Sequence, residues 1–219
     1  MTGERTTAGR AERGDSGWDP AAWAPLSSAL VSDCLDRFQA MDAGIRLLSG
    51  RRLLGPAFPV KTMVGENSTL HLSLLEAPAG SVLVIDAEAH LGRAVWGEVL
   101  TIAAEEVGVV GVVLDGACRD IGAISERGFP LFARGVCPAG PHKGWKGHIG
   151  VTVQCGGVVV NPGDLVLGDD DGIVVVPQER IDEVAVAAAD RMRAEAEWIR
   201  RIRAGEPSSS VLNIAGGPA

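Results

Sequence analysis

The chain has 219 residues, of which 46% are hydrophobic and 22% are charged, and its formal net charge at pH 7 is −8. This composition is typical of a soluble globular protein with one sizeable core. The acidic balance argues against nucleic acid as a ligand, because phosphate binding requires clustered Lys and Arg. No apolar run reaches the roughly 18 residues of a membrane span, and the polar N-terminus is unlike a secretory signal. We therefore expect a cytoplasmic protein that binds neither membranes nor nucleic acid.

The pattern along the chain predicts three parts: a flexible N-terminal arm over residues 1–24, a single domain over 25–206 and a loosely ordered C-terminal tail over 207–219. The four cysteines lie far apart and form no CxxC pair. We expect them to be reduced thiols, and their spacing does not predict a zinc site.

The first third of the domain predicts three elements. Apolar residues at helical spacing predict a helix over Pro25–Met41, capped by Ser27 or Ser28. A strand over Leu53–Val64 is interrupted by prolines, which favours a place near a sheet edge. A short helix is predicted over Asn67–Glu76.

From Ser81 onwards, apolar strands alternate with helices, which predicts a largely parallel sheet covered on both faces. The predicted elements are a strand over Ser81–Asp86, a long loop, a helix over Trp96–Val107, a strand over Val109–Leu114, a helix over Ile121–Arg127 closed by Gly128, and a strand over Phe129–Arg134. After Gly135, short strands joined by Gly, Pro and Asp turns predict a β-rich half. A long helix is predicted over Pro177–Arg203, with Gly205 after its end.

Three polar residues stand out in this pattern: Glu98, Arg119 and Asp120. Glu98 opens a predicted helix, whereas Arg119 and Asp120 follow a buried strand. Twenty residues separate Glu98 from Arg119, enough for one helix and one strand. Ligands of open α/β sheets bind outside the carboxyl ends of the strands, so we expect the three side chains to share a pocket.

The same pocket is expected to bind an anion and a cation. The first helical amides, at Glu98, Val99 and Leu100, lack partners within the helix and suit a carboxylate, and Gly97 allows a ligand to approach the backbone. Asp120 offers hard oxygen ligands for Mg²⁺ or Mn²⁺, and Arg119 suits a carboxylate or enolate oxygen.

Each residue also has a purely structural interpretation. Asp120 could cap the helix that starts at Ile121, Glu98 could complement a helix dipole, and Arg119 could form a surface ion pair. The combination of all three favours the functional interpretation.

An acidic residue, twenty intervening positions and then Arg-Asp make the chain resemble the RraA-like family, which includes metal-dependent 4-hydroxy-4-methyl-2-oxoglutarate/4-carboxy-4-hydroxy-2-oxoadipate aldolases. The likeness covers roughly residues 26–206 and includes the segments VSDCLDRF, LLGPAFPVKT, EAPAGSVLVIDAEAHLGRAVWGE, GVVLDGACRD, GFPLFARG and NPGDLVLGDDDGIVVVP. It implies a layered α/β/β/α sandwich of the swivelling-domain-like type, with a partly parallel sheet and a β-rich half.

The resemblance also implies roles for individual residues. Asp120 would be the direct ligand of Mg²⁺ or Mn²⁺, Arg119 the substrate clamp, and Glu98 the residue that orders a metal-bound water. Substrate-binding amides would come from Gly97 to Leu100. A glutamate from the terminal helix of a neighbouring subunit, best matched by Glu195 and otherwise by Glu197, would complete the site in a homotrimer or a hexamer.

Two departures from the family pattern leave the substrate open. Ile121-Gly122-Ala123 stands where the family often has a further acidic residue, and Pro-Ser-Ser-Ser follows Gly205-Glu206. Asp120 is retained, whereas family members that inhibit ribonuclease E can lack it, and this favours an enzyme.

The expected function is a class II aldolase that releases pyruvate from a 4-hydroxy-2-oxo acid, with the metal stabilising the enolate and with oxaloacetate decarboxylation as a related activity. A lysine Schiff base is disfavoured, because the lysines lie outside the motif loops. Two alternatives remain: a non-catalytic regulator that binds a ribonuclease, and a related lyase for a different 2-oxo acid.

The remaining polar candidates carry weaker predictions. His90 and Arg93 could touch substrate. The glycine-rich loop with His142, Lys143, Lys146 and His148 is interpreted as structural or as a pocket wall. His71 is interpreted as a core or interface histidine.

Overall fold

The computed structural model describes residues 17–214, in which eight strands form one mixed sheet and two more form a hairpin. The sheet order is β1-β5-β4-β3-β2-β9-β10, with β6 attached to β2. The strands are β1 (Arg46–Ser49), β2 (Leu53–Lys61), β3 (Val82–Trp96), β4 (Gly111–Cys118), β5 (Leu131–Val136), β6 (His148–Ile149), β9 (Leu165–Asp169) and β10 (Gly172–Val176), and the hairpin pairs β7 (Val153–Cys155) with β8 (Val158–Val160).

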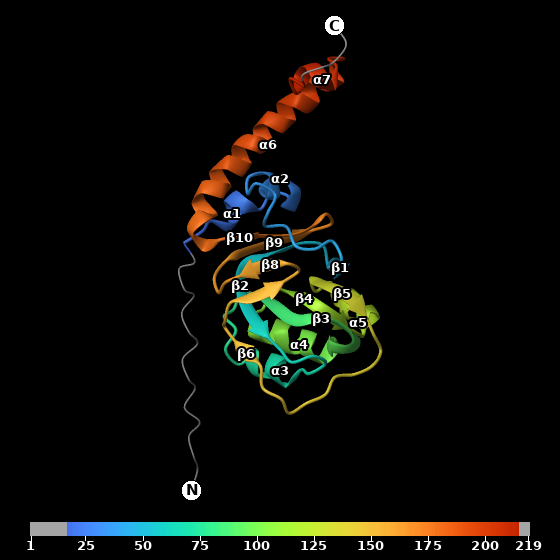
Figure 1. Cartoon of the computed structure of the whole chain (residues 1–219). Coiled ribbons are helices and arrows are strands. Elements are labelled where there is room, and N and C mark those ends of the chain that lie inside the picture. Colours follow the sequence, from blue (N-terminus) through green and yellow to red (C-terminus); the bar gives the residue numbers. More distant parts are fainter. Residues whose placement is uncertain (1–16, 215–219) are drawn as a thin grey trace.

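Helices cover this β structure on two sides (Figure 1). They are α1 (Pro20–Trp23), α2 (Ser28–Asp33), α3 (Ser68–Ser73), α4 (Glu98–Val107), α5 (Ile121–Arg127), α6 (Ile181–Arg203) and α7 (Ser208–Val211), with a 3-10 turn over Gln178–Arg180. No helix between residues 17 and 214 combines the length and apolarity needed to cross a membrane.

Three hydrophobic cores define four layers. The first packs α3, α4 and α5 on one face of β3, β4 and β5. The second lies between β layers, where Val84 and Phe132 meet Val160 and Val175. The third packs α1, α2 and α6 against the outer face of β9 and β10. Because strand side chains alternate between faces, β9 sends Val166 into the second core and its neighbours into the third. The predicted α/β/β/α sandwich is therefore confirmed.

The parallel part of the sheet consists of β2, β3, β4 and β5, each paired with the next. The prediction that β2 lies near an edge is wrong, since β3 and β9 flank it. The strand accommodates its prolines by changing partner along its length. Residues 53–56 pair with β9 and residues 57–61 with β3, and the Pro59 carbonyl also accepts a hydrogen bond from the Gly150 amide.

The predicted helix over Pro25–Met41 is much shorter, because α2 ends at Asp33. Ser27 caps it by accepting a hydrogen bond from the Leu30 amide, as expected. Beyond it, Asp36 and Arg37 adopt left-handed conformations. This turn lets the chain run along the free edge of β10, where the Met41 amide donates to the Ile173 carbonyl.

β3 is longer than predicted, because it continues through the expected loop as far as Trp96. Glu88 and Ala89 adopt left-handed conformations, and the register with β4 shifts three times between Asp86 and Trp96. The strand thus bulges outwards and rejoins β4, where Trp96 lies opposite Cys118.

The N-terminal end of the described chain packs on the body, and the C-terminal end packs on the outer part of α6 (Figure 1). Pro20–Trp23, within the segment predicted to be an arm, forms α1, and its Trp23 is buried; residues 1–16 of that segment lie outside the described residues. The tail forms α7, in which Val211 is buried. Residues 208–211 are therefore helical where a loosely ordered tail was expected, and residues 215–219 lie outside the described part.

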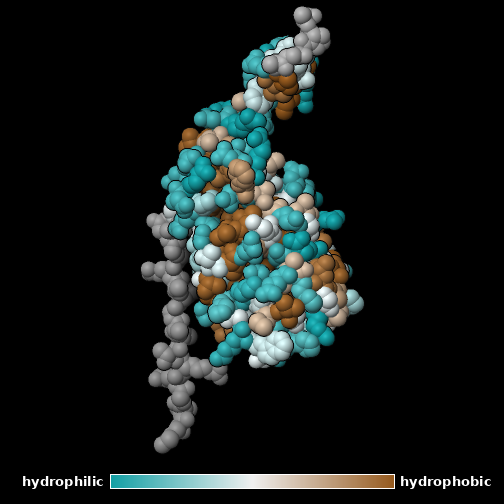
Figure 2. Space-filling view, in the orientation of Figure 1, coloured by the Kyte–Doolittle hydropathy of each residue, from teal (hydrophilic) through white to brown (hydrophobic). Residues whose placement is uncertain are grey.

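The terminal helix α6 is anchored by its first half. Ile181, Val184 and Ala188 are buried in the third core, and the rest of the helix extends away from the body on the side opposite α3 and α4 (Figure 1). Figure 2 shows hydrophobic side chains gathered towards the tip of this extension, where Ile199 and Leu212 are exposed.

Candidate functional site

The candidate site forms where β3 and β4 end. Trp96 and Cys118, their last residues, lie opposite each other, and the Arg119 amide donates to the Trp96 carbonyl over 3.0 Å. The residues that follow the two strands are therefore neighbours: Gly97 and Glu98 after β3, and Arg119 and Asp120 after β4. The structure brings Gly97, Arg119 and Asp120 together at this sheet edge, as the sequence pattern predicts, whereas Glu98 is not among the residues that line the cleft beside them.

The carboxylate of Asp120 faces the start of α4. Its Oδ2 accepts a hydrogen bond of 3.2 Å from the backbone amide of Glu98. Asp120 also occupies the N-cap position of α5 but makes no side-chain hydrogen bond to that helix. Its φ of 60° is unfavourable for a residue with a side chain, at a cost of about 1 kcal/mol. This conformation turns the carboxylate away from α5 and towards α4, so the structural interpretation of Asp120 as a cap for α5 is not supported.

Gly97 makes room for this carboxylate. A Cβ atom at Gly97 would lie 2.6 Å from Oδ2 of Asp120 and 3.2 Å from Cγ of Arg119. Because these distances are shorter than any ordinary contact, a side chain here would displace the carboxylate. The glycine is required for close approach, since its φ of −170° is open to any residue.

The guanidinium of Arg119 lies between Asp120 and a glycine-rich loop. Its Nε is 3.4 Å from Oδ2 of Asp120. A Cβ at Gly140 would come within 2.8 Å of Nη1 of Arg119, so the loop backbone lies against the guanidinium. The side chains of Arg119 and Asp120 are 42% and 41% exposed, which leaves both accessible to a ligand.

A cleft of about 340 Å³ opens beside these residues. It is lined by the end of β3, by Gly97, Val99 and Leu100 at the start of α4, and by Arg119 and Asp120. The first amides of a helix have no partner within it. The Glu98 amide bonds to Asp120, so the amides of Val99 and Leu100 are the ones available to a bound anion.

The opposite wall combines two residues that the sequence pattern did not assign to a site, Asn67 and His71, with Lys143 of the glycine-rich loop. Asn67, His71 and Lys143 line the cleft. Lys143 Nζ lies 3.3 Å from Nε2 of His71, and burial together with the charge of Lys143 lowers the pKa of His71. His71 is half-buried and lines the cleft, so it is not a core residue, and its place at an interface stays a prediction. The glycine-rich loop is confirmed as a pocket wall through Gly140, Pro141 and Lys143.

Asn67 has an unusual hydrogen-bonding state. Its Nδ2 donates to the Val95 carbonyl over 3.2 Å. Its Oδ1 is buried without a partner in the protein. A buried acceptor without a hydrogen bond costs free energy.

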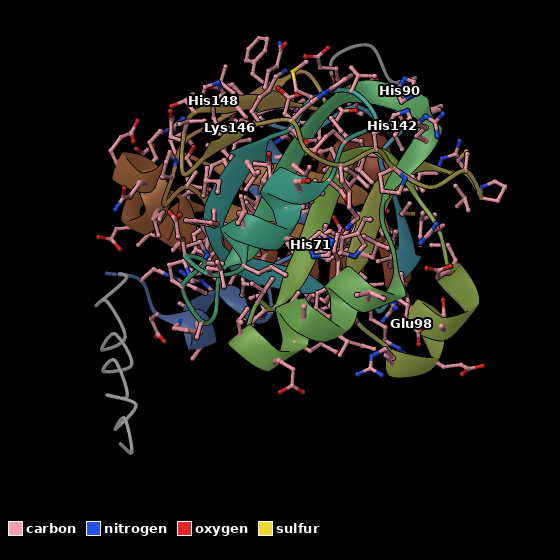
Figure 3. The ribbon with its side chains drawn as sticks, turned by 90° about the horizontal axis from the view of Figure 1, so that it is seen from below. His71, His90, Glu98, His142, Lys146 and His148 are labelled. Atoms are coloured by element: carbon pink, nitrogen blue, oxygen red, sulfur yellow. The ribbon has the colours of Figure 1, made fainter. Side chains whose placement is uncertain are left out.

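The other candidates do not line the cleft. Arg93 donates from Nη1 to the Gly140 carbonyl over 3.0 Å and so supports the loop. His90 lies on the bulged part of β3. Lys146 and His148 lie well away from Glu98 and His71 (Figure 3). Burial raises the pKa of the Cys118 thiol to about 12, so this neighbouring residue is no nucleophile at neutral pH.

Glu195 does not reach the cleft of its own chain. It lies on α6, which extends from the opposite side of the body (Figure 1). Arg191 donates to its carboxylate over 3.0 Å and also bonds to Asp33. The fallback residue Glu197 pairs with Arg200 on the exposed surface of the same helix.

The donor set suits a hard cation that keeps most of its water. Within residues 17–214 no group of three or more His, Cys, Asp or Glu side chains is arranged to hold a metal. Mg²⁺ requires only one or two protein carboxylates. Asp120 meets that requirement, because its carboxylate borders the cleft and a glycine clears the space beside it.

Comparison with known proteins supports the family resemblance seen in the sequence. Residues 28–175 match the model of the RraA-like family, described as Aldolase/RraA. A protein of Halalkalibacterium halodurans, named "Putative 4-hydroxy-4-methyl-2-oxoglutarate aldolase", is 36% identical over 187 residues, which are 82% of this chain and 89% of that protein.

Two solved structures share the fold. The Streptomyces coelicolor protein RraAS2, described as an unusual member of the RNase ES inhibitor RraA family, is 30% identical with a TM-score of 0.74, covering 84% of this chain and 96% of its own. The RNA-processing inhibitor RraA from Thermus thermophilis is 31% identical with a TM-score of 0.63, and the match covers 68% of this chain and 92% of that protein.

Proposed function

Because this chain belongs to the RraA-like family, we propose that it is a divalent-metal-dependent class II aldolase, a lyase that cleaves a 4-hydroxy-2-oxo acid to pyruvate. The main support is the convergence of three groups on one cleft: the amides at the start of α4, the guanidinium of Arg119 and the carboxylate of Asp120. This cleft suits a 2-oxo acid whose keto oxygen becomes negative during the reaction. It places an anion site, the permanent positive charge of Arg119 and a hard oxygen ligand side by side.

Substrate binding begins with the carboxylate next to the keto group. In this proposal it accepts hydrogen bonds from the amides of Val99 and Leu100, where the helix dipole favours negative charge. Gly97 contributes by leaving the backbone accessible. The keto oxygen then lies towards Arg119 and Asp120.

Asp120 would hold Mg²⁺ or Mn²⁺, and the bound cation would supply Lewis-acid stabilisation for the charge that develops on the keto oxygen. Arg119 adds a second, permanent positive charge beside that oxygen. The pairing of Arg119 with Asp120 keeps the guanidinium in place before substrate arrives.

Cleavage also needs a base for the 4-hydroxyl proton. We assign Glu98 to this step through a water molecule that its carboxylate orients. Glu195 would assist from a neighbouring subunit, in a homotrimer or a hexamer. The exposed apolar residues at the tip of α6 and α7, including Ile199, Ile202 and Leu212, favour such an assembly, because they leave an apolar surface without cover in the single chain.

The far end of the cleft carries positive charge. Lys143 and His71 form this wall, and the ammonium of Lys143 suits a second carboxylate on the substrate. This feature favours a dicarboxylic substrate such as 4-hydroxy-4-methyl-2-oxoglutarate. Oxaloacetate, another 2-oxo dicarboxylate, would lose CO₂ through the same enolate.

The proposal is tested by measuring pyruvate release from 4-hydroxy-4-methyl-2-oxoglutarate with Mg²⁺ or Mn²⁺ and again with EDTA. We expect turnover that EDTA abolishes and that either metal restores. Turnover that persists in EDTA would reject metal dependence. A panel of other 2-oxo acids then tests the related possibility that the chain is a lyase for a different substrate.

The second candidate function is that of a non-catalytic regulator of a ribonuclease. The observation in its favour is that two similar structures are named as inhibitors of RNA processing or of an RNase. It predicts a stable complex with a ribonuclease in a pull-down and no turnover of any 2-oxo acid. A metal-dependent turnover without such a complex would exclude it.

A further inference from the structure

Four of the five residues from Gly65 to Thr69 bond to one loop of the cleft wall, and the fifth, Glu66, pairs with His142 in an isolated β-bridge. The carbonyl of Gly65 accepts from the His142 amide, the amide of Asn67 donates to the His142 carbonyl, the Ser68 hydroxyl accepts from the Gly144 amide, and the Thr69 hydroxyl accepts from the Gly147 amide. We call this set of contacts between residues 65–69 and 142–147 the clasp.

Glu66 lies at the centre of the clasp and is fully buried. No Lys, Arg or His within residues 17–214 forms a salt bridge with it. Its oxygens instead accept hydrogen bonds from the Ser68 amide, at 2.6 Å, and from the Thr62 hydroxyl. Burial would raise the pKa of this carboxyl, but hydrogen bonds from Ser68, Thr69 and Gly144 outweigh burial and lower it. Glu66 is therefore a buried anion that accepts from the Ser68 amide, and the Ser68 hydroxyl in turn accepts from the Gly144 amide of the loop.

The clasp connects the parts of the cleft that recognise the far end of a ligand. Asn67 and His71 lie on the α3 side, and Lys143 lies on the loop side. The contact between Lys143 and His71, over 3.3 Å, crosses from one segment to the other. Because Lys143 has a long flexible side chain, its position depends on how firmly the loop is held.

We propose that Glu66 is a positioning residue: by holding the loop of residues 142–147 on α3, it fixes Lys143 opposite His71 and so gives the cleft its preference for substrates with a second carboxylate. This proposal rests on the aldolase function proposed above. Glu66 itself does not line the cleft, so its effect passes through the loop.

The central variant is Glu66→Gln, which preserves shape but replaces one acceptor with a donor that faces amide N–H groups. The two substrates are 4-hydroxy-4-methyl-2-oxoglutarate and 4-hydroxy-4-methyl-2-oxopentanoate, which has a methyl group in place of the far carboxylate. We expect kcat/KM for the dicarboxylate to fall about tenfold or more, mostly through KM, and kcat/KM for the monocarboxylate to stay within about twofold.

A double-mutant cycle with Lys143→Met separates positioning from general damage. If Glu66 acts through Lys143, the double variant will be no worse on the dicarboxylate than Lys143→Met alone. Equal losses on both substrates, or losses that multiply in the double variant, would overturn the proposal. The matched control is Glu76→Gln, the same change at an exposed position just beyond α3, which should leave both substrates unaffected.

Ser68→Ala covers the case in which Glu66→Gln fails to fold. It removes the hydroxyl that holds the Gly144 amide while leaving the buried carboxylate, and we expect the same selectivity change at smaller size. Unchanged selectivity in a folded Ser68→Ala protein would count against the clasp.

Amide hydrogen exchange tests the clasp independently of activity. We expect the Gly144 and Gly147 amides to exchange about tenfold faster or more in Glu66→Gln, with no change in α4. If neither substrate is cleaved by the unmodified protein, the proposed function fails, and this measurement still decides whether Glu66 holds the loop. Unchanged exchange at both glycines would overturn that role.

Discussion

Trp96 and Cys118 lie opposite each other at the ends of two adjacent parallel strands. This single pairing determines the composition of the candidate site, because the next residues on each strand are the ones that carry its chemistry. Helix α4 starts one residue after Gly97, and α5 starts directly after Asp120. Any change that shifts this register would separate the anion-binding amides from the carboxylate.

Gly97→Ala should abolish activity without unfolding the protein. The added methyl group would lie 2.6 Å from Oδ2 of Asp120, so the carboxylate must move, whereas the extended backbone accepts alanine. We expect a loss of about 100-fold or more in kcat/KM, measured as pyruvate release. The matched control is Gly122→Ala in α5, where a Cβ meets no atom within 4 Å. Full activity in Gly97→Ala would show that the position of this carboxylate does not matter.

Asp120 caps the start of α4, and its proposed binding of a cation is a second, separable role. Asp120→Asn retains an oxygen that accepts from the Glu98 amide, and Asn tolerates the left-handed backbone better than most residues. We expect its free energy of unfolding to be close to that of the unmodified protein but its metal-dependent activity to be lost. Asp120→Ala should be less stable than Asp120→Asn by about 1–2 kcal/mol, measured by urea unfolding. An active Asp120→Asn enzyme would rule out a direct role for the charge.

The titration of His71 should respond to its two charged neighbours in opposite directions. Burial lowers its pKa, Lys143 lowers it further, and Glu66 raises it. Lys143→Met removes a repulsive positive charge, so the pKa of His71 should rise. In the Lys143→Met background, where Lys143 no longer contributes, Glu66→Gln removes a favourable negative charge, so the pKa of His71 should fall. NMR titration of the ring protons measures both, and a pKa of His71 that is the same in all three proteins would contradict the charge assignment.

The proposed contribution of Glu195 to the cleft of a neighbouring subunit predicts complementation between inactive variants. Asp120→Ala and Glu195→Ala chains should each be inactive alone. When co-expressed, they should regain part of the activity, because a chain with intact Asp120 can receive Glu195 from its neighbour. Glu197→Ala is the control, since that carboxylate pairs with Arg200 and should not be needed. Activity that does not return on co-expression would place Glu195 outside the neighbouring cleft.

Much of the fold could be predicted from sequence, because the central strands are continuous apolar runs and the helices between them end at residues such as Gly128. The neighbourhood of Glu98 and Asp120 followed from the length of one helix and one strand. The length of β3 could not be predicted, since Glu88 and Ala89 adopt left-handed conformations that their residue types do not favour.

The contact between His71 and Lys143 in the opposite wall of the cleft could not be predicted from sequence, for a different reason. His71 and Lys143 are 72 positions apart, and neither belongs to a pattern with a fixed spacing. Their contact depends on how a loop packs on a helix, which only the tertiary structure reveals. The partner change along β2 was hidden in the same way, because prolines alone favour an edge strand.

The outward bulge of β3 has a consequence for how such proteins diversify. Eleven residues of β3, from Asp86 to Trp96, run beside only four residues of β4, from Asp115 to Cys118. The surplus chain protrudes to the surface and returns to the same endpoint. Insertions or deletions in it would reshape the outer rim while leaving the start of α4 where it is, so evolution can vary length there at little risk to the chemistry beneath.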